Sequence, residues 1–327
     1  MREGITSMTS ATRRRALFAG ASLCLTLVLG GLILSVSQAS TSSLPLGTAV
    51  KNSKIDTSCP AGSTCLGFDV SCPGLSKSPS FFMSLSDAKA PARGTVVFLS
   101  DQVGTKWWSA ENPEAAETLT SLRNAGLRIV QIRWSSAWST APTGTSPGAA
   151  SLACRPVTAI RAAYSRYHVP LGLSPSADVC GFCVVGNGIG ASPIGYALSH
   201  YGQDGIIDGA VMMAGPTHAA LAKSCGSDPA ELAYHFSQGA RSSVDKMYGV
   251  LTGDGPCATS DPSFASMWTD DAIATGGNDY SHPTTSISFL VGGLDATGQA
   301  VASDYAAALA SGGTPAQTSV LAGIKSR

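Results

Sequence analysis

Apolar residues along the chain alternate between short continuous runs and longer stretches with helical spacing. The continuous runs predict strands that are buried on both faces, and they cover residues 95–99, 127–134, 183–185, 209–214, 286–291 and 318–321. The helical stretches predict helices over residues 113–125, 156–168, 191–200 and 303–309. This alternation favours an α/β protein with a mostly parallel central sheet flanked by helices.

One segment, residues 216–280, breaks the alternation. It contains Cys225 and Cys257, several glycines and no clear strand pattern. Long excursions of this kind between sheet elements often cover a functional site. We therefore expect a disulfide-bearing insertion that forms a cap over one end of the sheet.

The N-terminal residues 1–39 have the features of an export signal. Three arginines, Arg13 to Arg15, precede an apolar run over residues 16–36, and small residues follow at Ser37 and Ala39. We expect cleavage after Ala39, although the run is long enough that an uncleaved N-terminal membrane anchor is the alternative. Residues 40–58 are rich in Ser and Thr and predict a flexible leader, which leaves residues 59–327 as the folded domain.

Composition restricts the classes of partner. Apolar residues make up 44% of the chain and charged residues only 13%, with a formal net charge of zero. Because binding to nucleic acid needs a basic stripe, and no Lys/Arg cluster occurs beyond the N-terminus, we expect no nucleic-acid partner. Membrane contact is expected only through an uncleaved N-terminal segment. The composition fits a secreted or cell-envelope bacterial protein.

Eight cysteines remain once Cys24 of the export segment is set aside. They are Cys59, Cys65, Cys72, Cys154, Cys180, Cys183, Cys225 and Cys257. An even number in an exported chain predicts disulfides, with a Cys225–Cys257 pair and links among the first three cysteines as the favoured pairings. No second pair of ligands accompanies Cys180 and Cys183 at zinc spacing, so we expect no metal. No nucleotide fingerprint is present either, so we expect no cofactor.

The strand at 183–185 leads into a glycine-rich turn, Gly186 to Gly190, and then into a helix. Serine hydrolases place their nucleophile on such a strand-turn-helix unit, with the pattern G-x-S-x-G. The stretch from Cys180 to Gly202 resembles the nucleophile turn of secreted bacterial α/β-hydrolases of the esterase/lipase type. The likeness extends in order from Thr95 to Asp295, and it implies an α/β-hydrolase fold.

That resemblance implies a catalytic triad in the order serine, acid, histidine. The nucleophile position is Gly188, which has no side-chain oxygen. The acid position is Asp295, for which simple capping of the following helix is the alternative role. No histidine follows Asp295, because His168, His200, His218, His235 and His282 all precede it. A histidine beyond Arg327 would supply only one of the missing groups.

The resemblance also implies an oxyanion site built from backbone N–H groups. Ile189 supplies one such N–H, and Val103 and Gly104 lie in the loop that supplies the other. A carboxylate at Asp101 in the same loop would oppose an oxyanion unless the loop turns it away. His218 follows the strand at 209–214 and is expected to line the site, with a binding role favoured over catalysis.

Four further residues have candidate structural roles. Ser192 lies inside the helix after the turn, and we expect its hydroxyl to bond locally and not to act as nucleophile. Asn187 is expected to bond beneath the turn. Trp107 and Trp108 either line the mouth of the site or belong to the core.

The sequence therefore supports three hypotheses. The first is an exported esterase/lipase-like protein that has lost catalysis and binds a small acyl or ester ligand in the old pocket. The second is an active carboxylic ester hydrolase with a non-standard site, for which fold analogy is the warrant. The third is a decaying paralogue without a selected function.

Overall fold

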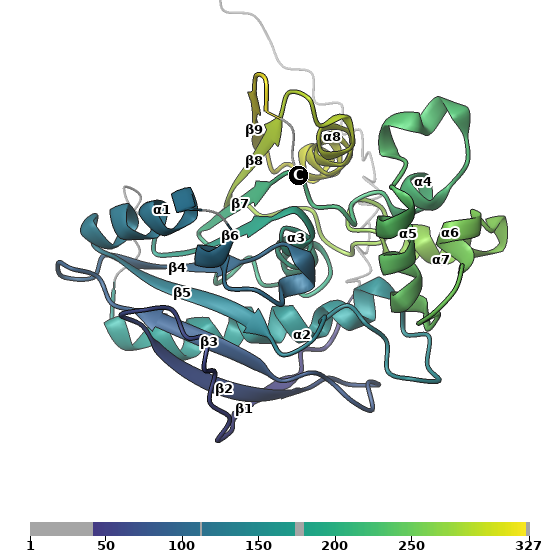
Figure 1. Ribbon diagram of the computed structural model, residues 1–327. Coiled ribbons are helices and arrows are strands. Elements are labelled where there is room, and N and C mark those ends of the chain that lie inside the picture. The colour runs from purple at the N-terminus through teal and green to yellow at the C-terminus, as the bar shows by residue number, and fades with distance from the viewer. Residues whose placement is uncertain (1–41, 112, 174–179, 325–327) are drawn as a thin grey trace, which may run out of the picture. The chain divides into compact units, whose positions relative to one another are not determined.

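The computed structural model describes residues 42–111, 113–173 and 180–324 (Figure 1). The chain divides into two units, Met1–Ser40 and Thr41–Arg327. The predicted export segment lies outside the described residues, and its cleavage remains a prediction. Within the ranges that are described, none of the helices has both the length and the apolar character of a membrane span.

Nine strands form one sheet in the unit Thr41–Arg327. They are β1 (Thr48–Lys51), β2 (Thr64–Ser71), β3 (Phe81–Ser86), β4 (Gly94–Leu99), β5 (Leu127–Trp134), β6 (Phe182–Asn187), β7 (Gly209–Met213), β8 (Ser286–Gly292) and β9 (Ala316–Leu321). Their order across the sheet is β1-β2-β3-β5-β4-β6-β7-β8-β9. The pairs β1–β2, β2–β3 and β3–β5 are antiparallel, and every pair from β5 to β9 is parallel.

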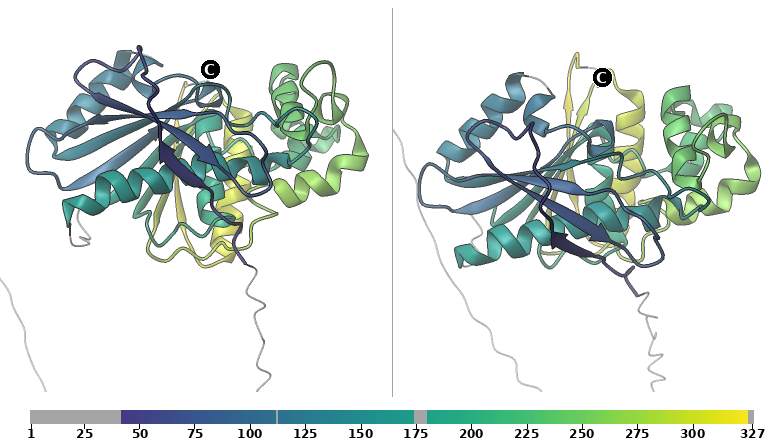
Figure 2. Two further views of the ribbon diagram at one scale, coloured as in Figure 1. Left: turned by 90° about the horizontal axis from the view of Figure 1, so that it is seen from below. Right: turned by 60° about the horizontal axis from the view of Figure 1, so that its bottom comes forward.

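Helices cover both faces of this sheet (Figures 1 and 2). They are α1 (Pro113–Asn124), α2 (Gly148–Ala163), α3 (Ser192–Ser199), α4 (Leu221–Cys225), α5 (Gln238–Asp245), α6 (Pro256–Thr259), α7 (Ala265–Asp271) and α8 (Ala296–Ser311). Helix α1 packs on one face, whereas α2, α3 and α8 contribute to the larger core cluster on the other. The predicted α/β architecture is confirmed.

Side chains along β4 alternate between the two faces of the sheet, and this explains why the sequence of the strand is a continuous apolar run. Val96 and Phe98 pack in the cluster that includes α1, and Val97 and Leu99 pack in the cluster that includes α2 and α3. Successive side chains of a strand point to opposite faces. Because both faces of β4 are covered by helices, every position along it is apolar or buried.

The predicted strands after residue 94 are all present, but two helices begin earlier than predicted. Helix α2 starts at Gly148 and contains Pro156, at which we expected it to begin. Its first N–H groups, those of Ala149 and Ala150, donate to the carboxylate of Asp271 at 3.0 and 3.3 Å. A start signal that lies more than a hundred residues away in the sequence cannot be found by local pattern. Helix α8 likewise begins at Ala296, directly after Asp295.

The prediction of a flexible leader over residues 40–58 is wrong for residues 48–51. Residues 48–51 form β1, which pairs with β2 from Thr48 opposite Ser71 to Lys51 opposite Phe68. The side chains of β1 are mostly exposed and carry no apolar pattern, so its strand character comes mainly from backbone pairing with β2. Strands β2 and β3 were not predicted either.

All eight cysteines outside the export segment pair. The disulfides are Cys59–Cys65, Cys72–Cys154, Cys180–Cys183 and Cys225–Cys257. The predicted Cys225–Cys257 pair and a link among the first three cysteines are both present. The Cys72–Cys154 bond ties the end of β2 to α2.

The segment between β7 and β8 consists of helices and turns. It contains α4 to α7, and the Cys225–Cys257 disulfide joins α4 to α6. The carboxylate of Asp245, fully buried at the end of α5, accepts backbone N–H groups from Gly255, Cys257 and Ala258 at 2.7–3.2 Å. The segment is thus an ordered unit with its own internal bonds.

Candidate functional site

The turn that follows β6 lies directly against the end of β4. It consists of the short helical turn Gly188–Gly190, which continues into α3. A Cβ atom on Gly190 would lie 2.4 Å from the carbonyl oxygen of Ser100 and 2.6 Å from that of Leu99. Glycine is therefore required at this position, since any side chain would separate the two backbones.

This close approach places the Asp101 carboxylate beside Gly188. The backbone N–H of Ile189 donates to Asp101 Oδ1 at 3.2 Å. Gly188 has a φ of +54°, and a Cβ atom there would lie 2.8 Å from the same oxygen. The carboxylate is not turned away by its loop. It lies where a nucleophile side chain would begin, and it occupies the N–H that we expected to serve an oxyanion.

Glu111 stabilises the position of the Asp101 loop beside the turn. Its Oε1 accepts the backbone N–H of Asp101 at 2.5 Å, and its Oε2 accepts Nδ2 of Asn187 at 3.3 Å. Burial raises the pKa of Glu111, and the hydrogen bonds from Asp101 and Asn187 oppose that shift. Asn187 thus bonds beneath the turn, as predicted, and Glu111 links the loop after β4 to the end of β6.

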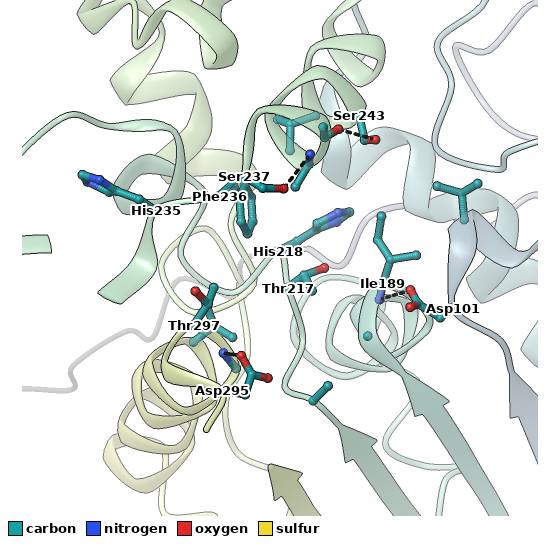
Figure 3. A pocket seen from close by; sticks show the side chains of 18 residues that line it. Asp101, Ile189, Thr217, His218, His235, Phe236, Ser237, Ser243, Asp295 and Thr297 are labelled. Atoms are coloured by element: carbon teal, nitrogen blue, oxygen red, sulfur yellow. Dashed lines mark hydrogen bonds between the residues drawn. The ribbon is translucent and has the colours of Figure 1, made fainter. Parts of the chain in front are cut away.

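A cavity of about 550 Å³ opens above this turn. It lies beyond the carboxyl ends of the parallel strands, where ligand sites of open α/β sheets gather. Five of the six residues that we predicted for the site line it: Val103, Gly188, Ile189, His218 and Asp295. Figure 3 shows Asp101 and Ile189 on one side of the cavity and Asp295 and Thr297 on another.

Gly104 and the two tryptophans lie elsewhere. A Cβ atom on Gly104 would lie 2.7 Å from Cδ1 of Trp134, so this glycine faces the core. Trp107 and Trp108 are buried, and the ring of Trp108 lies 4.5 Å from that of Phe98. Both tryptophans therefore belong to the interior and not to the mouth of the cavity.

The predicted cap forms one wall of the cavity, with residues that the sequence did not single out. His235, Phe236, Ser237 and Ser243 line the cavity from the region of α5 (Figure 3). Ser237 caps α5 by accepting the N–H of Ala240, and this serine before a helix is the one local signal that the sequence offered. Nothing in the sequence pattern shows that this helix faces the turn after β6.

Asp295 has the capping role that was the alternative to a triad acid. Its Oδ1 accepts the backbone N–H of Gly298 at 2.9 Å at the start of α8. The segment after β9, where a triad histidine would follow, is bonded by its backbone to the neighbouring turn: Gly293 N–H donates to Leu321 O and Leu294 N–H to Ile324 O. The residues described there, 322–324, are Ala, Gly and Ile.

His218 and Ser192 are both buried near the floor of the cavity. The ring of His218 is packed between the rings of Trp138 and Tyr196, with centroids at 6.0 and 5.8 Å, and its Nδ1 has no hydrogen-bond partner in the part of the chain that the structure describes. Ser192 is fully buried, and its Oγ accepts the backbone N–H of His218 and bonds to Oγ1 of Thr217, each at 3.1 Å. Its hydroxyl bonds locally, as predicted.

Backbone strain is concentrated at this site. Three residues other than glycine have positive φ in the described part of the chain, and two of them, Val103 at +56° and Ala214 at +58°, line the cavity. Such conformations cost about 1–3 kcal/mol each and cluster at functional sites. The surrounding structure therefore maintains the shape of this cavity against local backbone preference.

The strand order, with three antiparallel strands at one edge and the glycine turn after the central strand β6, decides the fold. The chain has an α/β-hydrolase fold. Its nucleophile position follows β6, its acid position follows β8, and its cap lies between β7 and β8.

No protein-family model and no curated protein sequence matches the chain. Solved structures of similar fold include Est1E from Butyrivibrio proteoclasticus, with 9% identity, a TM-score of 0.47, and 80% of this chain and 89% of that chain covered. Thermogutta terrifontis esterase 2 phosphonylated by sarin has 12% identity and a TM-score of 0.46 over 75% and 79% of the two chains. Esterase Est22 has 12% identity and a TM-score of 0.48 over 80% and 72%.

The buried histidine of the cavity makes stability depend on pH. Burial lowers the pKa of His218 to about 3, whereas an exposed histidine titrates near ~6.5. Protons therefore bind the unfolded chain more readily, and the contribution of His218 is complete above about pH 6.5 and is lost as the pH falls towards 3. Between pH 7 and pH 5, we expect the wild type to lose about 2 kcal/mol more unfolding free energy than His218→Gln.

Denaturant unfolding at the two pH values measures this difference. Tyr196→Phe is the control, because it disturbs a ring beside His218 without removing the imidazole, and it should keep the wild-type dependence on pH. Equal pH dependence in the wild type and in His218→Gln would show that the imidazole is not held neutral by the fold.

Proposed function

We propose that this protein is a non-catalytic member of its fold class that binds a small ligand in the cavity above Gly188. The observation that carries the proposal is the Asp101 carboxylate, which lies beside Gly188 and accepts the N–H of Ile189. Catalysis of acyl transfer depends on donors aimed at a developing negative charge. A carboxylate in that place occupies the donor and repels the charge.

Other serines near the cavity give no support to a hydrolase with a displaced nucleophile. Ser192 is buried and bonded to Thr217. Ser237 caps α5, and the hydroxyl of Ser243 donates to the carbonyl oxygen of Gly239 at 3.0 Å. A serine nucleophile needs a base within hydrogen-bond reach, and the partners of these hydroxyls are backbone groups or another hydroxyl.

The walls of the cavity indicate the chemistry of the ligand. Ile189, Phe236 and Val301 offer apolar surface that suits a short acyl chain. Asp101 and Asp295 place two carboxylates on the same cavity, and no Lys or Arg is among the described residues that line it. We therefore propose a small acyl-type ligand whose head group donates hydrogen bonds, such as an amine, an amide or an alcohol, in preference to a plain ester.

We also propose that the protein is exported and remains in the cell envelope or is secreted. Its four disulfides support this, since disulfides persist in oxidising compartments. The arginine-led apolar run before Ala39 supports it from the sequence.

Labelling with a fluorophosphonate probe tests the absence of catalysis. We expect the intact mass of the purified protein to stay unchanged after incubation, because no serine is activated. An active serine esterase treated in parallel serves as the positive control. Covalent modification of any serine in this chain would overturn the non-catalytic proposal.

Restoring the serine alone should not restore activity. Gly188→Ser introduces a side chain at positive φ and against Asp101, and we expect a loss of about 1–3 kcal/mol in unfolding free energy without hydrolysis of a short acyl ester. Gly188→Ala is the matched control for the backbone effect. The double variant Gly188→Ser with Asp101→Ala should recover part of the stability and remain inactive, since the described residues after Asp295 include no triad histidine to act as the base. Ester hydrolysis by Gly188→Ser above the parent background would contradict this.

Thermal-shift measurements with butylamine, butanol and methyl butyrate test the ligand class. We expect the amine to stabilise the protein most, because it can donate to Asp101. Ala240→Trp should abolish the shift, since Ala240 lines the cavity from α5. Ser242→Trp is the control on the same helix, at a position that does not line the cavity. A shift that survives in Ala240→Trp would place binding outside this cavity.

A further inference from the structure

A second cluster of polar side chains lies at the opposite end of the sheet from the cavity. Asp204 belongs to the loop that leads into β7, and Asp279 and His282 belong to the loop that leads into β8. One potential ligand atom from each of the three lies within 4.8 Å of the other two. The cluster is therefore built by neighbouring parallel strands at their amino ends, whereas the cavity lies beyond the carboxyl ends.

His282 is the unusual member of this cluster. It is fully buried, and neither Nδ1 nor Nε2 has a hydrogen-bond partner among the described residues. Buried polar side chains almost always have partners, so an imidazole with both nitrogens unsatisfied needs an explanation. The two carboxylates lie close to it, yet in the described residues neither Asp204 nor Asp279 forms an ion pair with Lys or Arg.

Several hydrogen bonds outside the cluster hold the backbone that carries these side chains. Thr285 Oγ1 donates to the carbonyl oxygens of Asp204 at 3.4 Å and Ile207 at 2.8 Å, and this joins the two loops. The N–H of His282 donates to Oγ1 of Thr314 at 2.5 Å. The N–H of Asp279 donates to the carbonyl oxygen of Ser199 at 3.2 Å. The three side chains are thus presented to one point by a fixed scaffold.

We propose that Asp204, Asp279 and His282 bind a divalent transition-metal ion, with Zn²⁺ preferred and water completing the coordination. Two carboxylate oxygens and one imidazole nitrogen form a donor set that zinc accepts. The imidazole favours such an ion over Ca²⁺ and Mg²⁺, which take oxygen ligands. A bound ion gives one nitrogen of His282 its missing partner and neutralises two carboxylates that lack cations.

Binding requires a small contraction of the cluster. Tetrahedral zinc with bonds of about 2.0–2.2 Å holds its ligand atoms roughly 3.4 Å apart. Asp204 and Asp279 are half-buried, and Oδ1 of Asp279 accepts the backbone N–H of Ser281 at 2.8 Å, whereas His282 is buried in the interior. The ion would cross-link the loops before β7 and β8, and its role is structural because no part of the cavity touches it.

Isothermal titration of the full chain, produced without a polyhistidine tag, tests this site with Zn²⁺ as the probe. We expect one ion per chain, a higher thermal midpoint in its presence, and weaker binding of Ca²⁺. Asp204→Asn and Asp279→Asn should each weaken Zn²⁺ binding by about tenfold or more, in line with losses seen when metal sites are altered. Asp254→Asn, which changes an exposed carboxylate in the cap, is the matched control and should bind like the wild type.

His282→Asn gives a second arm, and the two aspartate variants keep the test valid if that buried substitution prevents folding. The proposal is overturned if the wild type binds no Zn²⁺. It is also overturned if Asp204→Asn and Asp279→Asn bind as tightly as the wild type, or if Ca²⁺ binds more tightly than Zn²⁺. None of these outcomes depends on whether the cavity binds a ligand.

Discussion

The site depends on the contact between two backbones, where the turn after β6 meets the end of β4 without any side chain between them. Gly190 permits that contact, since even a Cβ atom would collide with the carbonyl oxygens of Leu99 and Ser100. The contact brings the loop after β4 under the turn, and it thereby sets the Asp101 carboxylate beside Gly188. In a serine hydrolase this turn exposes the nucleophile. In this chain the same position is faced by the Asp101 carboxylate.

The proposed loss of hydrolase chemistry rests on several positions together. Gly188 has no side-chain oxygen, the Asp101 carboxylate accepts the N–H of Ile189, and Asp295 caps α8. Glu111 adds a further layer, because it bonds both the backbone of Asp101 and the side chain of Asn187. A single substitution at Gly188 would crowd the Asp101 carboxylate and leave the Asp295 cap of α8 unchanged, so the arrangement is a property of the whole turn and its supporting loop.

The cap gives the cavity its outer wall, and it is anchored to the sheet domain by Asp271. That carboxylate accepts the N–H groups at the start of α2 and the hydroxyl of Tyr248. The Cys225–Cys257 disulfide and buried Asp245 then order the helices around α5. Helix α5 is consequently held in place as a wall of the cavity.

The sequence by itself determined the α/β class, the strands from residue 94 onwards and the glycine at the nucleophile position. Continuous apolar runs and glycine-rich turns are local features that follow from burial on both faces and from backbone geometry. It did not reveal β1, whose strand character comes from pairing with β2, or the start of α2, which Asp271 caps from far along the chain. Only the tertiary structure decided that Asp101 faces Gly188, that α5 closes the cavity, and that Asp204, Asp279 and His282 meet. Each of these depends on contacts between residues that are distant in sequence, and such contacts leave no periodic pattern.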